Sequence, residues 1–312
     1  MMLVEPQCLR DKRAALKKDN KRPGLNLPAI SRREIELVKH LKCHEGHVMA
    51  SFDFVSLEPS VSAAWSNDPM YKYATFEGIG KKPYLSHDGV LMLDDIYLMT
   101  ASQLPMFKDP LLETFEKYKL YDAWMDPEYP DHDRVKKHKE IKKMRDISKT
   151  ACLGLERGMG VDKLCLDVRA KSGYEMTRQE GQLVKDTFWG FYEGLKDLNN
   201  GLTSLVKKQG YFITRPFGFK VNCTPHKAYA FFTQAQASGV IEVMAMKLFA
   251  IAPYVKFLAL IHDEIIVTFP KEMVEQFRID LYRCLDSLNE DLKWSVPMRV
   301  GLEIGNNFGE MK

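Results

Sequence analysis

The sequence predicts a mixed α/β (α+β) protein in which a long helical segment is inserted into one discontinuous sheet. Strand-like runs occur near both ends of the chain, within 47–54, 257–269 and 296–305. The stretch between them, 110–205, has helical periodicity and no long strand pattern. A chain of 312 residues is long enough for one large domain or two coupled subdomains.

The composition argues against a membrane-spanning or secreted protein. Lys and Arg together number 45 against 42 Asp and Glu, and this net charge of +3 neither requires nor excludes a nucleic acid partner. No apolar run approaches the roughly 18–20 residues that span a bilayer, and the N-terminus lacks the pattern of a secretory signal. The six cysteines are scattered without a CxxC pair, as is typical of reduced thiols. We therefore expect a cytoplasmic protein without membrane contact.

The first half of the chain shows clear start and stop signals. Residues 1–24 are rich in Lys and Arg and end at Pro-Gly, which favours a mobile or partner-dependent arm. Alternation and turn signals then predict, in order, a strand over 47–54, a helix over 57–65, a hairpin or loop over 78–94 and a helix over 95–104 that Pro105 stops.

The second half returns to strands after the helical stretch. Alternation around a turn predicts a hairpin over 210–221, and an apolar pattern predicts a long helix over 226–250. Two β-rich runs within 257–269 flank a polar turn. An amphipathic helix over 271–292 and a strand over 296–305 complete the chain.

Carboxylates stand at two of the predicted strand ends. Asp53 ends the first strand, with Glu58 five residues later, and His262-Asp263-Glu264 lies between two β-rich runs. A carboxylate that interrupts a buried strand is costly unless it is paired, hydrogen-bonded or bound to metal. Taken singly, each could equally be a solvated turn residue.

A basic stripe marks the predicted helix that contains residues 145–157. At about 100° per residue, one face carries Arg145, Lys149, Leu153 and Arg157, whereas Met144, Ile147, Ala151 and Leu155 face the other way. Fixed cations opposite carboxylates that hold Mg²⁺ are what phosphoryl transfer requires. A solvated surface helix is the alternative interpretation.

The order of these segments resembles the three polymerase motifs of family A DNA polymerases, the bacterial DNA polymerase I type. The motifs are Asp53…Glu58, Arg145-x3-Lys149-x7-Arg157-Gly158 and His262-Asp263-Glu264. Weaker segments agree in order: LNLPAI (25–30) resembles the family's NLQNIP, DIYLMTA (95–101) resembles DIHRATA, QASG (236–239) resembles its glutamine segment, and VPMRVGLEIGNNF (296–308) resembles its C-terminal ending. The likeness extends from about residue 20 to residue 312.

The resemblance implies a right-hand polymerase fold. It implies an N-terminal arm and lead-in (1–44), a palm with an antiparallel sheet (45–110 and 211–312) and helical fingers (111–210). Counterparts of the family's thumb and exonuclease are not recognised. We therefore expect the palm-and-fingers portion of a split, phage-type polymerase, with a second polypeptide supplying the thumb and possibly a 3′–5′ exonuclease.

The resemblance also implies a role for each motif residue. Asp53, Asp263 and the backbone carbonyl of Phe54 would hold two Mg²⁺ ions, with Mn²⁺ as an alternative, and Glu264 would support the metal or the primer end. Lys149 would donate a proton to pyrophosphate. The residues expected at the dNTP are Arg145, Lys149, Leu153, Glu58 as the steric gate against a 2′-hydroxyl, and His262. Those expected at the primer-template DNA are Arg157, Gly158, Gln236, Asn26 and Arg22.

The sequence departs from the family at several of these positions. Leu153 stands where the family has Phe or Tyr, and Arg157 stands where it has the Tyr that positions the template base. The catalytic carboxylates are intact, so the sequence predicts a DNA-directed DNA polymerase, a nucleotidyltransferase of DNA replication. The two substitutions instead favour a catalytically weak module that binds primer-template.

A single-subunit RNA polymerase or primase-like enzyme is the other alternative, because such enzymes share this palm. They usually carry His-Asp-Ser in the last motif and a small residue at the gate. His262-Asp263-Glu264 and Glu58 therefore favour DNA synthesis.

Overall fold

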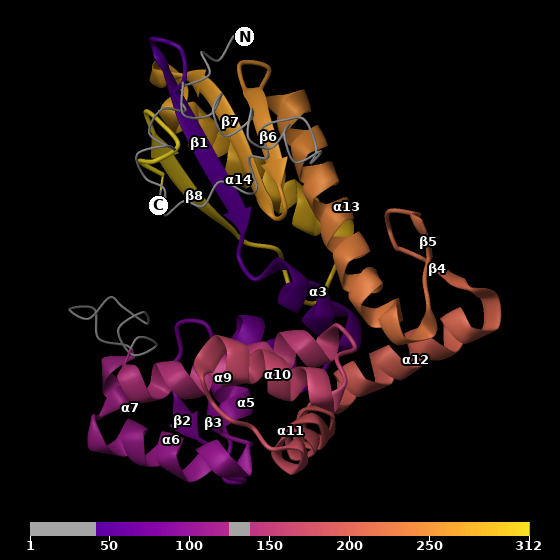
Figure 1. Cartoon of the computed structure of the whole chain (residues 1–312). Coiled ribbons are helices and arrows are strands. Elements are labelled where there is room, and N and C mark those ends of the chain that lie inside the picture. The colour runs from indigo at the N-terminus through magenta and orange to yellow at the C-terminus, as the bar shows by residue number, and fades with distance from the viewer. Residues whose placement is uncertain (1–41, 125–137, 312) are drawn as a thin grey trace, which may run out of the picture. The chain divides into compact units, whose positions relative to one another are not determined.

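The computed structural model describes residues 42–124 and 138–311 (Figure 1). Asn26, Arg22 and the basic arm lie outside the described residues. The chain divides into two compact units. Unit 1 comprises residues 1–57, 237–293 and 298–312, and unit 2 comprises 58–236 and 294–297. The predicted palm and fingers boundaries stay a prediction.

Unit 1 is built on a four-stranded antiparallel sheet. In spatial order its strands are β6 (Lys256–Ile261), β7 (Glu264–Pro270), β1 (His47–Phe54) and β8 (Val300–Gly305). The short 3₁₀ helix η4 (Lys271–Met273) and α14 (Val274–Leu292) follow β7. The long helix α13 (Ala228–Ile251) belongs to unit 1 from Ala237 onward.

Successive side chains of each strand point to opposite faces of this sheet. On one face Phe52 of β1 and Phe269 of β7 are fully buried, and their rings lie 6.4 and 4.3 Å from the ring of Phe277 in α14. Burying each such ring contributes about 1.5–3 kcal/mol. Helix α14 therefore covers this face of the sheet.

The opposite face of the sheet carries polar groups at one end. Met49 and Ile266 pack there with Met311 in a small apolar cluster. Ser51 and Asp53 follow Met49 at intervals of two residues, so they lie on this same face. The carboxylate of Asp53 is therefore directed away from the side that α14 covers.

Unit 2 is mainly helical (Figure 1). Its described helices are α3 (Leu57–Ser66), α4 (Pro69–Lys72), the π-helix η2 (Tyr73–Glu77), α5 (Ile96–Ala101), α6 (Pro105–Lys117), α7 (Leu120–Ala123), α9 (Lys139–Glu156), α10 (Val161–Ser172), α11 (Arg178–Phe191), α12 (Glu193–Gln209), η3 (Pro225–Lys227) and the first part of α13. Two small hairpins pair β2 (Tyr84–Leu85) with β3 (Leu91–Met92) and β4 (Tyr211–Ile213) with β5 (Lys220–Asn222).

The structure confirms most of the predicted elements and shortens one. The first strand and the helix after it lie where the sequence places them. The final strand begins at Val300 rather than at 296, because the backbone of Met298 is hydrogen-bonded to a side chain of α14. The side chain of Asn289 accepts a hydrogen bond from Met298 N at 2.7 Å and donates one to Met298 O at 3.0 Å.

No helix within the two described stretches combines the length and apolar character that crossing a membrane requires.

Candidate active site

The acidic residues of the first and last motifs meet at one end of the unit 1 sheet. Asp53 lies directly opposite Glu264 in the pairing of β1 with β7. The two-residue turn His262-Asp263 joins β6 to β7, and Phe54 N donates a hydrogen bond to Asp263 O at 3.1 Å. Asp53 and Asp263 are exposed, and Glu264 is half-buried. The sheet therefore gathers three carboxylates from distant parts of the sequence.

The backbone of His262 has an unusual conformation. Its φ is +55°, in the left-handed region that tight hairpin turns use and that glycine occupies most easily. A side chain in this region costs on the order of 1–2 kcal/mol. Strain kept beside a carboxylate cluster is typical of a functional turn. The imidazole of His262 is exposed.

Two neighbours of the acids did not emerge from the sequence analysis. The Ser51 hydroxyl donates to the carboxylate of Glu264, and Ser51 itself is buried. Gly301 of β8 lies opposite Asp53, where an added Cβ would stand 3.1 Å from Asp53 Oδ1. The spacing of two from Asp53 could have identified Ser51, and a glycine inside a strand often marks a close approach.

The donor chemistry fits magnesium, provided that the substrate completes the coordination. Within residues 42–124 and 138–311, no group of three or more His, Cys, Asp or Glu side chains is arranged to hold a metal ion alone. Mg²⁺ is usually bound by one or two carboxylates, with water and substrate phosphates as the other ligands. The exposed carboxylates of Asp53 and Asp263 are such a pair. They suit an ion that is shared with a nucleotide.

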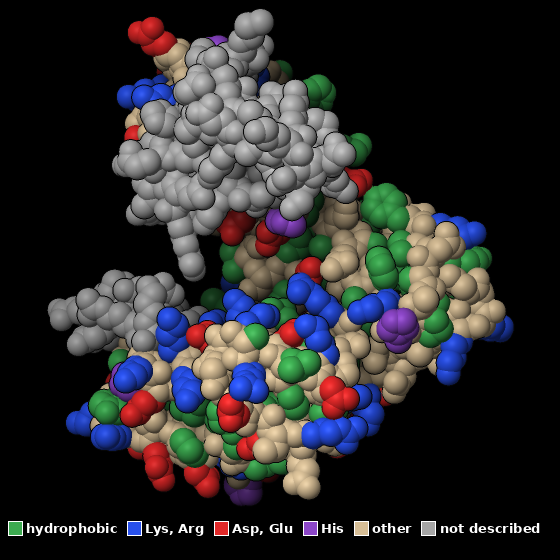
Figure 2. Space-filling model, viewed as in Figure 1, with side chains coloured by type: hydrophobic (Ala, Val, Ile, Leu, Met, Phe, Trp, Pro, Cys, Tyr) green, Lys and Arg blue, Asp and Glu red, His purple; other side chains and the backbone are tan. Residues whose placement is uncertain are grey.

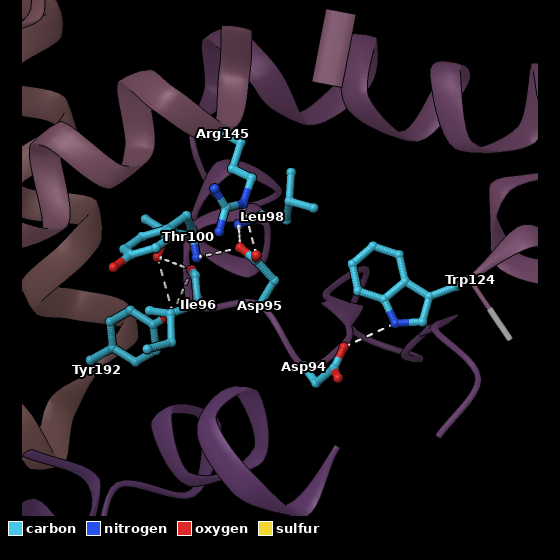
Figure 3. Close-up of polar contacts among 9 residues, drawn as sticks. Asp94, Asp95, Ile96, Leu98, Thr100, Trp124, Arg145 and Tyr192 are labelled. Carbon is cyan, nitrogen blue, oxygen red and sulfur yellow. Dashed lines mark hydrogen bonds and ion pairs between the residues drawn. The ribbon is translucent and has the colours of Figure 1, made fainter. Parts of the chain in front are cut away.

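In unit 2, the cations of the second motif are fixed by helix α5. Arg145 Nε donates to Asp95 Oδ2 at 2.8 Å, and the Asp95 side chain is only 3% exposed (Figure 3). The other oxygen of Asp95 caps α5 by accepting from Tyr97 N and Leu98 N at 3.0 and 2.9 Å. One buried carboxylate therefore starts α5 and orients Arg145.

The ring of Tyr97 lies beside both cations of this motif. Its centroid is 5.1 Å from the guanidinium carbon of Arg145 and 5.7 Å from Lys149 Nζ, within cation–π range. Burial raises the pKa of Tyr97 far above its ordinary value, so the ring stays neutral. The sequence analysis noted this segment but missed the contacts of Asp95 and Tyr97 with α9.

The basic stripe on α9 is solvent-facing, and its opposite side is core. Ile147, Ala151 and Leu155 are buried as predicted, whereas Leu153 is half-buried. The exposed cations of this helix are Lys139, Lys142, Lys143 and Lys149. Figure 2 shows Lys and Arg side chains distributed over the face that α9 and α10 form.

The end of α9 connects the second motif to the predicted gate. Arg157 follows the last helical residue, and its Nη2 lies 3.4 Å from Glu58 Oε2 in α3. Gly158 has a φ of +74°, and an added Cβ would stand only 2.5 Å from His226 O. A larger residue at 158 would therefore require the backbone near η3 to move.

A buried carboxyl lies beside this pair. Glu156 is 7% exposed and accepts a hydrogen bond of 2.6 Å from the Tyr71 hydroxyl. Burial raises the pKa of Glu156 to about 7, and the hydrogen bond from Tyr71 opposes that rise. Sequence reasoning missed Glu156, because nothing in its spacing distinguishes it from a surface helix residue.

Gln236, expected at the primer-template, is fully buried. Its Nε2 donates to Arg215 O at 3.0 Å, and its Oε1 has no hydrogen-bond partner. Contact with DNA would require this side chain to become exposed, so the role stays a prediction. A pocket of about 380 Å³ on α11 and α12 is lined by none of the predicted site residues.

No known protein-family profile matches the sequence. DNA polymerase theta of Drosophila melanogaster is 22% identical in an alignment of 207 residues that covers 58% of this chain and 9% of that protein.

A solved structure, the POL domain of Pol1 from M. smegmatis in complex with DNA primer-template and dNTP, matches with a TM-score of 0.66 and 15% identity. The match covers 92% of this chain and 44% of that one, so this chain spans less than half the length of either protein. The likeness establishes the fold. The chain has the mixed helix-and-antiparallel-sheet fold of a polymerase domain.

Proposed function

We propose that this chain is a template-directed DNA polymerase, a nucleotidyltransferase that adds dNTPs to a primer 3′-hydroxyl in DNA replication. The observation that carries the proposal is the pairing of β1 with β7, which places Asp53 and Glu264 opposite each other and beside Asp263. The fold of a polymerase domain and the weak likeness to a DNA polymerase sequence support it.

In the proposed reaction the primer 3′-hydroxyl loses its proton to solvent, its oxygen attacks the α-phosphorus of the dNTP, and the bond from that phosphorus to pyrophosphate breaks. Asp53 and Asp263, with the carbonyl of Phe54, would hold two Mg²⁺ ions, which would supply positive charge that stabilises the transferring phosphate. The fixed cations Arg145 and Lys149 bind the triphosphate, and Lys149 protonates the departing pyrophosphate. Asp95 and Tyr97 keep both cations in place.

The remaining motif residues complete the proposed site. Glu264, held by Ser51, supports the metal or the primer end, and His262 contacts the nucleotide. Glu58 excludes the 2′-hydroxyl, and Leu153 lies at the nucleotide sugar. Arg157, Gly158 and Gln236 are proposed contacts of the primer-template.

Primer extension tests the proposal directly. Asp53→Ala and Asp263→Ala should each lower dNTP incorporation by several orders of magnitude, because electrostatic stabilisation of the transferring phosphate is lost, while primer-template affinity is kept. Asp286→Ala, which removes an exposed carboxylate from α14 in the same unit, is the matched control. Normal turnover by either acid variant would contradict the assignment.

The same assay separates the alternatives. A wild-type chain that binds primer-template but extends nothing is a binding module. A chain that extends efficiently only with rNTPs is an RNA polymerase or primase-like enzyme.

We also propose that a second polypeptide, carrying a thumb and possibly an exonuclease, binds the chain. Met246 and Phe249 of α13 are 69% and 73% exposed. Large apolar side chains exposed on one helix support the proposal that this helix binds another protein.

A further inference from the structure

We propose that Arg157 is a positioning residue that sets the sugar preference of the polymerase by holding the gate residue Glu58 in an ion pair. This inference rests on the proposed function and on the role of Glu58 within it. It assigns to Arg157 a task that differs from contact with the template.

The geometry gives Glu58 a partner on a different helix. Glu58 belongs to the first turn of α3, and its side chain is 33% exposed. Its Oε2 lies 3.4 Å from Arg157 Nη2 at the end of α9. A glutamate side chain loses considerable rotamer freedom when it is fixed. An opposite charge within ion-pair distance favours the one arrangement in which the two groups meet.

The backbone around Arg157 is fixed at three successive residues. The carbonyl oxygen of Arg157 accepts a hydrogen bond of 3.0 Å from Lys227 Nζ. Gly158, next in the chain, lies too close to His226 O to leave room for a Cβ. Glu156, before it, is buried and bonded to Tyr71. The side chain of Arg157 itself is 52% exposed.

A steric gate excludes a ribonucleotide by occupying the space that the 2′-hydroxyl needs. The position of the Glu58 side chain therefore decides which sugar fits. A carboxylate held by Arg157 has a defined place, whereas a free one samples several rotamers, some of which leave space for a 2′-hydroxyl. Charge is the essential property of the pair, because 3.4 Å is long for a hydrogen bond but well within ion-pair distance. Salt should therefore weaken the effect of the pair.

The experiment measures the ratio of kcat/KM for dNTP and rNTP in primer extension by the full chain. Exposed ion pairs contribute up to about 1 kcal/mol, which corresponds to a change of roughly fivefold. Arg157→Ala should thus lower the dNTP preference about two- to fivefold, and Arg157→Gln should do the same. Arg157→Lys should restore most of it.

Arg169→Ala is the control, because Arg169 of α10 also forms an exposed ion pair, with Glu175 at 3.2 Å. It should leave the preference unchanged. Raising the salt concentration should lower the preference of the wild-type chain and leave that of Arg157→Ala constant.

A double-mutant cycle decides whether Arg157 acts through the gate. In a Glu58→Ala background, Arg157→Ala should have no further effect on sugar preference. Additive effects would overturn the inference, as would equal losses with both nucleotides, which would leave Arg157 only a role in overall rate or template contact. A wild-type chain that extends neither nucleotide overturns the proposed function, and the inference with it. Extension with an unchanged preference overturns the inference alone.

Discussion

The carboxyl groups of this chain differ in the environment that surrounds them. Asp53 and Asp263 are exposed at the end of a sheet, where phosphate and metal can reach them. Glu156 is buried beside Tyr71, and burial favours its neutral form. Residues of the same chemistry are therefore available for different tasks, one set for binding a cation and one for packing.

Glu156 should make the stability of the chain depend on pH. Burial raises the pKa of Glu156 from an ordinary value of 4.5 to about 7 in the folded state. Its contribution to stability is therefore fully present below pH 4.5 and is lost as the pH rises toward 7, a loss of about 3 kcal/mol. In urea denaturation, Glu156→Gln should lose less stability between pH 5 and 8 than the wild type.

At pH 8 the Glu156→Gln variant should be more stable than the wild type, since it has no buried carboxylate to ionise. Glu113→Gln, an exposed change on α6, is the control and should follow the wild-type profile. Parallel profiles for all three proteins would show that Glu156 stays ionised when folded.

Gly301 should be needed for the position of the Asp53 carboxylate. A Cβ at 301 would stand 3.1 Å from Asp53 Oδ1, tighter than ordinary contact, so the carboxylate must shift. Gly301→Ala should lower kcat for extension about tenfold, because small displacements of reacting groups are costly. The free energy of unfolding should stay equal or rise, since glycine weakens a strand.

Gly201→Ala, where the added Cβ meets nothing within 4 Å, is the control for the Gly301 variant. Full activity in Gly301→Ala would mean that Asp53 does not need its present position.

At the level of elements, α5 and α9 behave as a coupled pair. Asp95 caps α5 and binds Arg145 of α9 (Figure 3), and Cys152 Sγ of α9 donates a hydrogen bond of 3.4 Å to Thr100 Oγ1 of α5. The short helix α5 therefore positions the basic residues of a longer one. A change of its N-cap residue Asp95 should therefore alter the proposed nucleotide site.

Asp95→Asn separates the two tasks of this side chain. Asparagine caps a helix about as well as aspartate, so α5 should keep its start. Arg145 loses its counter-charge, and weakening this charged hydrogen bond should cost about 1–3 kcal/mol of folding stability. We also expect KM for dNTP to rise. Asp95→Ala should also remove the cap of α5 and should therefore lower the folding stability further. An unchanged KM in Asp95→Asn would show that Arg145 needs no fixed orientation.

Sequence reasoning succeeded where a local pattern decides the structure. The strand pattern gave β1, which ends at Phe54, its observed bounds, and helical spacing identified the buried side of α9. It could not give contacts between distant segments. Asp95 with Arg145 and Ser51 with Glu264 depend on how elements pack, and the late start of β8 depends on the side chain of Asn289.

At the scale of the whole molecule, the chain matches 44% of the length of the solved polymerase-domain structure. The predicted metal-binding acids Asp53 and Asp263 belong to unit 1, and the predicted triphosphate-binding cations Arg145 and Lys149 belong to unit 2. Backbone contacts to duplex DNA supply much of the affinity of a polymerase for its template. For the proposed polymerase, synthesis over long templates is therefore the property that most needs further contacts.

The proposed second polypeptide should raise the length of the products more than the rate of single additions. Primer extension on short and long templates, with and without co-purified partner proteins, measures both quantities. Met246→Ser with Phe249→Ser should weaken the stimulation, whereas the short-template rate should be kept. Full-length products from the isolated chain on long templates would show that no partner is required.

The double pairing of β1 also limits how the length of the chain can change. Its residues are hydrogen-bonded to β7 on one side and to β8 on the other, with Asp53 opposite both Glu264 and Gly301. One residue inserted within β1 would turn Asp53 toward the face that α14 covers and bring an apolar side chain to its place. Insertions in the loops that join the strands carry no such penalty. Natural variants of this chain should therefore differ in length between these strands and not within them.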